Sequence, residues 1–186
     1  MVALLHRLAA AIQGFSEWSG RQLSWLVLAL VLIVSYDVAM RYLFQSGSVA
    51  LQELEWHLFA LIFLLGGAYT LKHDEHVRVD IFYSSRFMTA RHRAWVDLLG
   101  GLLFLTPFCL LLISGSLPFV SNSFNMLEAS PDPGGLPYRF LLKAAIPLGF
   151  LMLMLQGLAI MMASICTLLR FQDQNTSDKN IMAGER

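Results

Sequence analysis

Residues 66–83 read GGAYTLKHDEHVRVDIFY and form a charged break in an otherwise apolar sequence. It begins at the end of an apolar segment, carries a dense group of charged side chains, and precedes a second apolar segment that starts after Arg93. A charged break between two segments of membrane length is typical of a short aqueous loop. The basic residues of such a loop determine which side of the membrane it occupies. The stretch therefore predicts a series of membrane-spanning helices and provides the reference point for their topology.

The composition indicates an integral membrane protein with one compact unit. Of the 186 residues, 56% are hydrophobic and 14% are charged, and the mean hydropathy is +0.60. A soluble domain usually carries about 25% charged residues. The formal net charge is zero, so nucleic acid is not an expected partner. Cys109 and Cys166 both lie in apolar segments, and we interpret them as small buried side chains rather than as a disulfide or a metal pair.

The long apolar blocks predict an all-α integral membrane fold with four transmembrane helices. The predicted membrane domain covers residues 23–169, with spans at about 23–44, 53–71, 94–118 and 138–169. Pro107 is expected to kink the third span, because proline disturbs the helical turn before it. The tail at 170–186 is polar, and we expect it to be a disordered cytoplasmic segment.

Residues 1–22 are predicted to form an amphipathic helix that lies in the membrane interface. The predicted apolar stripe of this helix consists of Leu4, Leu5, Leu8, Ile12 and Phe15. Polar side chains, including those of Ser16 and Glu17, fall elsewhere around the helix. The segment is expected to act as a simple interfacial anchor or as a brace against a partner.

The distribution of Lys and Arg predicts that both termini are cytoplasmic. Three basic residues, Arg41, Arg139 and Lys143, fall on one side of the predicted spans. Ten fall on the other side, in the N-terminal segment, the second loop and the tail: Arg7, Arg21, Lys72, Arg78, Arg86, Arg91, Arg93, Arg170, Lys179 and Arg186. Since the side with more basic residues is usually cytoplasmic, the links at 45–52 and 121–137 are expected to face the outside.

Five ionisable residues are expected to be neighbours near the outer ends of the first two spans: Asp37, Arg41, Glu53, Glu55 and His57. Asp37 and Arg41 are four residues apart, so they share a helix face in the favourable order for an ion pair. Because a charge inside a membrane is costly, such residues usually pair or serve a function. One interpretation is a path for protons or cations. The other, which we favour because the cluster does not continue across the bilayer, is an interhelical lock or a partner interface.

No pattern in the sequence predicts catalysis or a bound cofactor. His73 and His76 have the spacing of metal ligands, but a pair without a distant third ligand is a weak signal. Only His57 lies within a predicted span, which argues against a haem held by two histidines. We find no nucleophile–base arrangement and no phosphate-binding glycine loop. Gln156, near the middle of the fourth span, is interpreted as a residue that forms an interhelical hydrogen bond.

Six short stretches, taken together in their order and spacing, resemble the small membrane subunit (Q subunit) of tripartite ATP-independent periplasmic (TRAP) transporters. The resemblance extends from about residue 23 to residue 169. The stretches are Arg41-Tyr42-Leu43-Phe44, Gln52-Glu53-Leu54-Glu55-Trp56, Gly66-Gly67-Ala68-Tyr69-Thr70-Leu71, His76-Val77-Arg78-Val79-Asp80, Arg93-Ala94-Trp95-Val96-Asp97 and Ile146-Pro147-Leu148-Gly149.

The resemblance implies a division of labour among three proteins. In that family, a soluble periplasmic protein captures the solute, often a carboxylate or a sulfonate, and a large membrane subunit carries it with sodium by an elevator movement. The small subunit packs beside the large one and helps to hold its scaffold and to receive the binding protein. The chain is thus expected in the bacterial inner membrane, among membrane lipids, with both proteins as partners. It is not expected to be an enzyme or to hold a cofactor.

Ten residues are expected at a partner interface or an interhelical lock: Asp37, Arg41, Glu53, Glu55, His57, His76, Arg78, Asp80, Asp97 and Arg139. Those at the outer rim, with the loop at 121–137, are expected to face the binding protein or to brace the large subunit. Those at 76–80 are expected to fix the second and third spans at the cytoplasmic face. The alternative hypothesis is a stand-alone small transporter that works as an oligomer and uses Asp37 and His57. A membrane redox protein is a third hypothesis.

Overall fold

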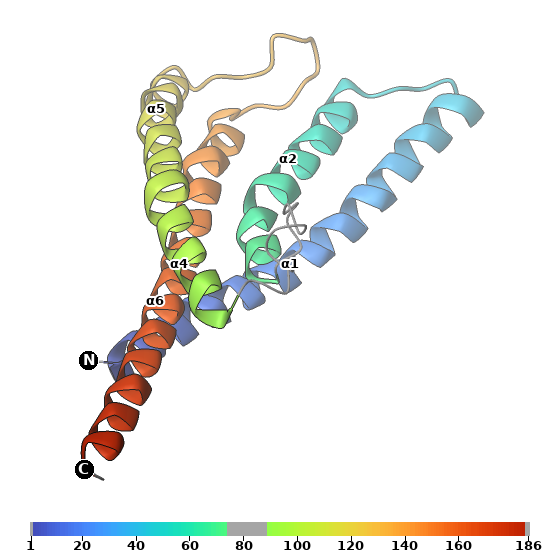
Figure 1. Cartoon of the computed structure of the whole chain (residues 1–186). Helices are drawn as coiled ribbons and strands as arrows, with labels where there is room; N and C mark the ends of the chain where they lie inside the picture. The colour runs from blue at the N-terminus through green and yellow to red at the C-terminus, as the bar shows by residue number, and fades with distance from the viewer. Residues whose placement is uncertain (1, 74–88, 185–186) are drawn as a thin grey trace.

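The chain folds into long helices, and the computed structural model describes residues 2–73 and 89–184 (Figure 1). In chain order the helices are α1 (Val2–Leu43), α2 (Val49–Lys72), α4 (Ala90–Gly100), the π-helical turn η1 (Gly101–Leu105), α5 (Thr106–Asn125) and α6 (Phe140–Gly184). Within the described residues, four helical segments are long and apolar enough to cross a membrane. This confirms the predicted all-α membrane fold, in which helices satisfy their own backbone polar groups.

α1 is one helix of 42 residues that passes through the boundary predicted near residue 22 without a break. Ser16 lies off the predicted apolar stripe of this segment, yet it is 2% exposed. Its hydroxyl donates to the side-chain oxygen of Gln156 in α6, at 2.8 Å. The predicted interhelical role of Gln156 is therefore confirmed. The interfacial position of residues 1–22 stays a prediction.

The third span extends further than predicted and contains a π-helical turn just before Pro107. It ends at Asn125, not near Pro118. Just before Pro107 the helix widens into η1, and the hydroxyl of Thr106 donates to the carbonyl oxygen of Gly101 at 2.8 Å. Proline lacks an N–H group and crowds the preceding turn, and a wider π turn relieves this crowding. The disturbance expected at Pro107 thus takes the form of a π-helical turn.

The backbone of α6 stays helical to Gly184, so the disorder predicted from residue 170 onward is wrong up to that residue. The sequence contains neither glycine nor proline between Gly157 and Gly184. Adding residues to an existing helix is much easier than nucleating a new one. A packed span can therefore continue into a polar segment, and α6 reaches 45 residues, about twice the length that crosses a bilayer.

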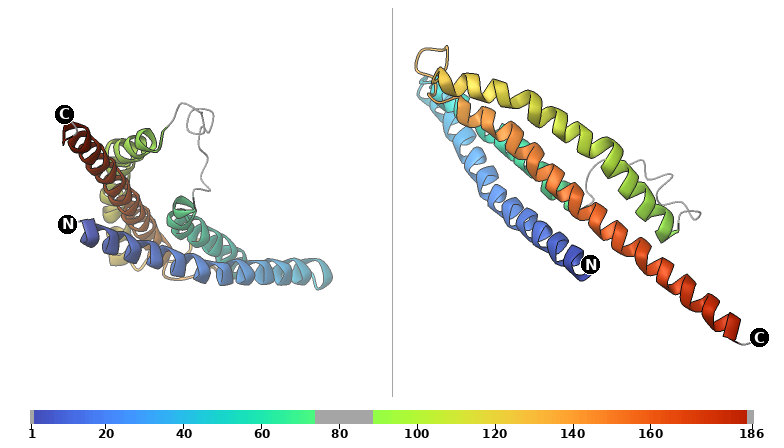
Figure 2. Two further views of the ribbon diagram at one scale, coloured as in Figure 1. Left: turned by 60° about the horizontal axis from the view of Figure 1, so that its bottom comes forward. Right: turned by 90° about the vertical axis from the view of Figure 1, so that its left-hand side faces the viewer.

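α6 is the central helix of the fold. It contacts α1, α2, α4 and α5, whereas α4 and α5 make extensive contact only with α6 and η1 among the described elements. Figures 1 and 2 show α4 and α5 on one side of α6, with α2 and α1 on the other. In the most apolar part of α6, 39% of the residues are buried, against 6% to 11% in the other three spans. Most apolar side chains of those three spans therefore keep part of their surface exposed.

Glycine lets α6 approach both of its neighbours closely. A Cβ atom at Gly149 would lie 2.5 Å from the backbone oxygen of Leu64 in α2. A Cβ atom at Gly157 would lie 2.3 Å from the side chain of Leu105 in η1. Such close backbone approach is typical of helix packing in membranes, where small residues lie at the contact.

Gly149→Ala is expected to lower the stability of the isolated chain by roughly 1–3 kcal/mol, because the new methyl group has to push α6 away from α2. The measurement is thermal or denaturant unfolding of the purified chain in detergent. Gly14→Ala is the matched control, since a Cβ atom there meets no heavy atom within 4 Å. An unfolding midpoint for Gly149→Ala at or above that of the control would contradict the assigned contact.

Candidate functional site

The buried carboxylate of Glu53 is the centre of a polar site near the start of α2. Glu53 is 4% exposed, and its partners come from residues 126–139, which we call the α5–α6 loop. Ser130 donates its hydroxyl to Oε1, and the backbone N–H of Leu136 donates to Oε2 at 2.6 Å. Nη2 of Arg139 donates to Oε1 at 3.1 Å. Three donors from one loop thus satisfy a carboxylate whose burial would otherwise be costly.

The α5–α6 loop folds back on itself around this carboxylate. The N–H of Ser130 donates to the carbonyl oxygen of Leu136 at 3.0 Å. The N–H of Arg139 donates to the carbonyl oxygen of Glu128 at 2.9 Å. These two backbone hydrogen bonds bring the two arms of the loop together, so that donors from both arms reach Glu53.

Two adjacent glycines allow the loop to close on Glu53. Gly134 has φ of +82°, a conformation that glycine adopts without steric cost. A Cβ atom at Gly135 would lie 2.8 Å from Oε2 of Glu53. Leu127 and Tyr138, at the two ends of the loop, also have positive φ values, of 47° and 63°. Positive φ is uncommon for residues of this size and persists where the surroundings hold it.

Both cations of the site contact a carboxylate and an aromatic ring. Lys143 pairs with Glu128, and its ammonium group lies 4.0 Å from the centroid of the Phe119 ring. The guanidinium of Arg139 lies 5.5 Å from the centroid of the Trp56 ring. The hydrogen bond from Lys143 holds the pKa of the Glu128 carboxyl below its ordinary value of 4.5. The ring contacts add cation–π attraction to the two ion pairs.

The ion pairs of the predicted outer-rim cluster form two separate contacts. Arg41 pairs with Asp37 inside α1, as their spacing predicts, whereas Glu53 pairs with Arg139. Asp37 is 1% exposed, and its Oδ1 atom has no hydrogen-bond partner within the described part of the chain. The side chain of Arg41 is 46% exposed, so one end of this pair is buried and the other is open.

Glu55 and His57 take no part in the hydrogen bonds of the Glu53 carboxylate. Nδ1 of His57 lies 2.5 Å from the backbone oxygen of Glu53, so the ring bonds to its own helix. Oε1 of Glu55 is buried without a hydrogen-bond partner among residues 2–73 and 89–184. Arg139, by contrast, bonds directly to the Glu53 carboxylate.

The predicted inner residues are only partly described. Asp97 lines a polar hollow of about 270 Å³ together with Gln13, Arg93 and Ser164, between α1, α4 and α6. His76, Arg78 and Asp80 lie outside the described residues.

Sequence reasoning missed two groups of charged contacts. One is the Glu128–Lys143 pair described above. The other is centred on Glu17 of α1, whose carboxylate lies 2.5 Å from Nζ of Lys72 and 3.0 Å from Nε2 of His73. Each of these residues is visible in the sequence as a charge flanking an apolar span. Sequence spacing can predict an ion pair only between residues of one helix. These contacts join different elements, so spacing gives no signal for them.

Comparison with known protein families finds a match over most of the chain. The family model described as "Tripartite ATP-independent periplasmic transporters, DctQ component" matches residues 30–167. The match covers well over half of the chain and includes Glu53 and the whole α5–α6 loop. No curated protein matches the sequence.

Glu53→Gln is expected to loosen the α5–α6 loop, because Arg139 loses its counter-charge while the side chain keeps its shape. Removing one partner of a buried, hydrogen-bonded charge costs roughly 1–3 kcal/mol or more. Hydrogen exchange of the loop amides in lipid nanodiscs should accelerate. Glu55→Gln is the matched control and should exchange like the wild type. Equal exchange in all three proteins would refute the role assigned to Glu53.

The stability of the chain should depend on pH through Glu128. Because the folded-state pKa of this carboxyl is lowered, its contribution is complete above the ordinary value of 4.5 and is lost as the pH falls through the lowered value. The unfolding midpoint should therefore fall on acidification below about pH 4.5. Glu128→Gln should start from a lower midpoint at neutral pH and lose less on acidification. A loss equal to that of the wild type would contradict this.

Proposed function

The chain belongs to the DctQ component family of tripartite ATP-independent periplasmic (TRAP) transporters, and from this premise we propose that it is the small accessory membrane subunit of such a transporter. In this proposal it packs against a large transport subunit. It thereby helps sodium-coupled uptake of an organic acid, a carboxylate or a sulfonate, which a periplasmic binding protein delivers.

The single observation that carries the proposal is the family match over residues 30–167. The distribution of burial supports it, because in three of the four spans few residues are fully buried by this chain. The position of the charges supports it as well. Among the described residues, the ion pairs of Glu53 and Glu128 join the α5–α6 loop to the ends of the spans, away from the middle of the bilayer. An accessory subunit needs no polar path of its own through the membrane.

The proposed location is the bacterial inner membrane, with both termini in the cytoplasm. The excess of Lys and Arg in the N-terminal segment, the second loop and the tail supports this orientation. In Figure 1 the two ends of the chain lie toward the same end of the helices. The α5–α6 loop then lies on the periplasmic side.

The α5–α6 loop is proposed as a receiving surface for the binding protein. Its charged groups are held by one another, and large apolar side chains remain exposed beside them: Met126, Leu127 and Tyr138. Exposed apolar groups next to ordered polar groups are typical of protein interfaces. Glu53 stabilises the conformation of the loop, and this conformation would then determine the positions of the exposed side chains that contact the partner.

The second candidate is a stand-alone transporter that works as an oligomer. The observation that favours it is the buried Oδ1 atom of Asp37, which has no hydrogen-bond partner in the described part of the chain. In this case Asp37→Asn and His57→Gln should abolish transport by the purified chain in liposomes. If the chain is an accessory subunit instead, uptake should require the other components for the wild type and for both variants.

Purification of the tagged chain from its native membrane in mild detergent tests the proposed function. A much larger membrane protein should co-purify in constant ratio, and its identity follows from mass spectrometry. Recovery of this chain alone, or only of its own oligomers, would contradict the proposal and favour the stand-alone transporter.

A further inference from the structure

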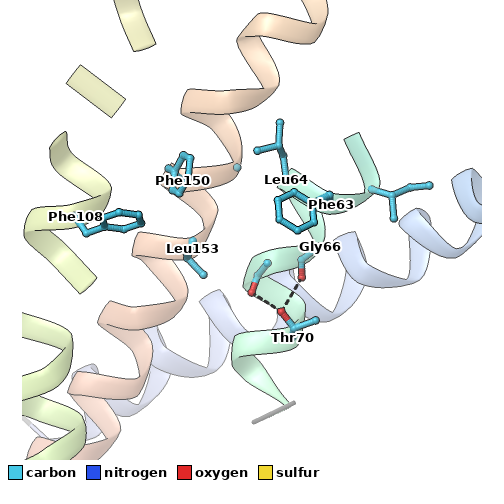
Figure 3. Close-up of a pocket in the computed structure, with 10 residues that line it drawn as sticks. Phe63, Leu64, Gly66, Thr70, Phe108, Phe150 and Leu153 are labelled. Atoms are coloured by element: carbon cyan, nitrogen blue, oxygen red, sulfur yellow. Dashed lines mark hydrogen bonds between the residues drawn. The ribbon is translucent and has the colours of Figure 1, made fainter. Parts of the chain in front are cut away.

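Two hollows of the described structure differ in the chemistry of their walls. The larger is a groove of about 420 Å³ between α2, α5 and α6, and Gly66 and Gly67 line it. Its one hydroxyl, on Thr70, donates to the carbonyl oxygens of these glycines at 3.4 and 3.0 Å, and its other lining side chains are hydrocarbon, as Figure 3 shows. The smaller is the polar hollow of about 270 Å³ between α1, α4 and α6. Of these two, the polar hollow is the one that offers polar groups to a ligand.

Three helices contribute hydrogen-bonding side chains to the polar hollow. They are Gln13 of α1, Arg93 and Asp97 of α4, and Ser164 and Thr167 of α6. Ser164 is 6% exposed, and its hydroxyl forms no hydrogen bond with another described residue. The hydroxyl of Thr167, by contrast, donates to the carbonyl oxygen of Ala163 at 3.0 Å. A nearly buried hydroxyl without a partner is costly, so a polar ligand in the hollow would stabilise it.

The α4 wall of the polar hollow carries both signs of charge. Arg93 and Asp97 are four residues apart, so they lie on one face of the helix. Both side chains already take part in other interactions. A guanidinium has five N–H groups and a carboxylate has two oxygens, so each can bond to a second partner. Ala90, the first residue of α4, also lines the hollow, and the start of a helix attracts anions. A ligand with both a phosphate and an ammonium group matches this wall.

The side chains beside the polar hollow favour a lipid over a soluble ligand. Trp95 lies between Arg93 and Asp97 in the chain and is exposed. Exposed tryptophan is typical of the level at which lipid headgroups meet the hydrocarbon core. Further along the same helical segment, Leu99 and Leu102 are exposed as well and offer apolar surface to acyl chains. A soluble phosphate compound would gain nothing from this surface.

We propose that the polar hollow binds the headgroup of a phospholipid with a primary ammonium group, of the phosphatidylethanolamine type. The phosphate accepts hydrogen bonds from Arg93 and Ser164, and the ammonium donates to Asp97. α1 and α4 make no extensive contact with each other within the described residues, so the headgroup would join them across the hollow. In the proposed orientation the lipid belongs to the cytoplasmic leaflet. The site is separate from the proposed partner contacts and does not depend on them.

The first test is native mass spectrometry of the delipidated full chain with three added lipids that have the same acyl chains. Phosphatidylethanolamine should be retained as one molecule per chain, at a several-fold lower concentration than phosphatidylcholine or phosphatidylglycerol. The ammonium of phosphatidylcholine has no N–H group and phosphatidylglycerol has no ammonium, so neither can bond to Asp97. Equal retention of the three lipids would overturn the proposal. O-phosphoethanolamine, which has no acyl chains, should bind far more weakly, and binding as tight as that of the lipid would overturn the membrane source of the ligand.

The second test uses substitutions in the hollow. Ser164→Ala should weaken the retention of phosphatidylethanolamine roughly 3- to 10-fold, because one hydrogen bond to the charged headgroup is lost. Ser114→Ala is the matched control, since Ser114 is exposed on α5 and bonds to its own helix. Asp97→Asn should remove the preference for phosphatidylethanolamine over phosphatidylglycerol, a ratio that a purely structural role of Asp97 would not change. Wild-type retention in Ser164→Ala, or an unchanged ratio in Asp97→Asn, would overturn the proposal.

Discussion

The contact of α6 with the other spans is the constraint on which the rest of the structure depends. Lipid surrounds a membrane helix with a medium as apolar as its own side chains, so helices associate through close packing and hydrogen bonds. α6 supplies both, through the bare backbone of Gly149 against Leu64 and through the hydrogen bond of Gln156 with Ser16. Both contacts hold α1 and α2 against one side of α6, whereas α4 and α5 pack on its other side.

The second constraint is the burial of a carboxylate at the start of α2. Glu53 accepts from donors that follow it by 77 to 86 residues, so one side chain determines the course of the whole α5–α6 loop. The loop contains two non-glycine residues with positive φ, and the bonds to Glu53 and between its own arms hold it in that form. These hydrogen bonds engage the polar groups of the site with one another.

Both constraints are consistent with a chain that belongs to a family of multi-component transporters. A chain whose central helix alone is well buried leaves large apolar surfaces that another membrane protein can cover. The α5–α6 loop lies at the end of the spans, where the proposed soluble partner would have access.

The amino-acid sequence alone predicts the membrane class, the four spans, the family resemblance, and the pairing of Asp37 with Arg41, because hydropathy and i,i+4 spacing are local properties. It also indicated that Gln156 bonds to another helix. Only the tertiary structure decided that Ser16 is its partner, that Arg139 and Ser130 bond to Glu53, and that Gly66 and Gly67 line a groove. The physical reason is that a helix apolar on all sides carries no periodic signal for its rotation or its neighbours. Those follow from how α6 packs against the other spans.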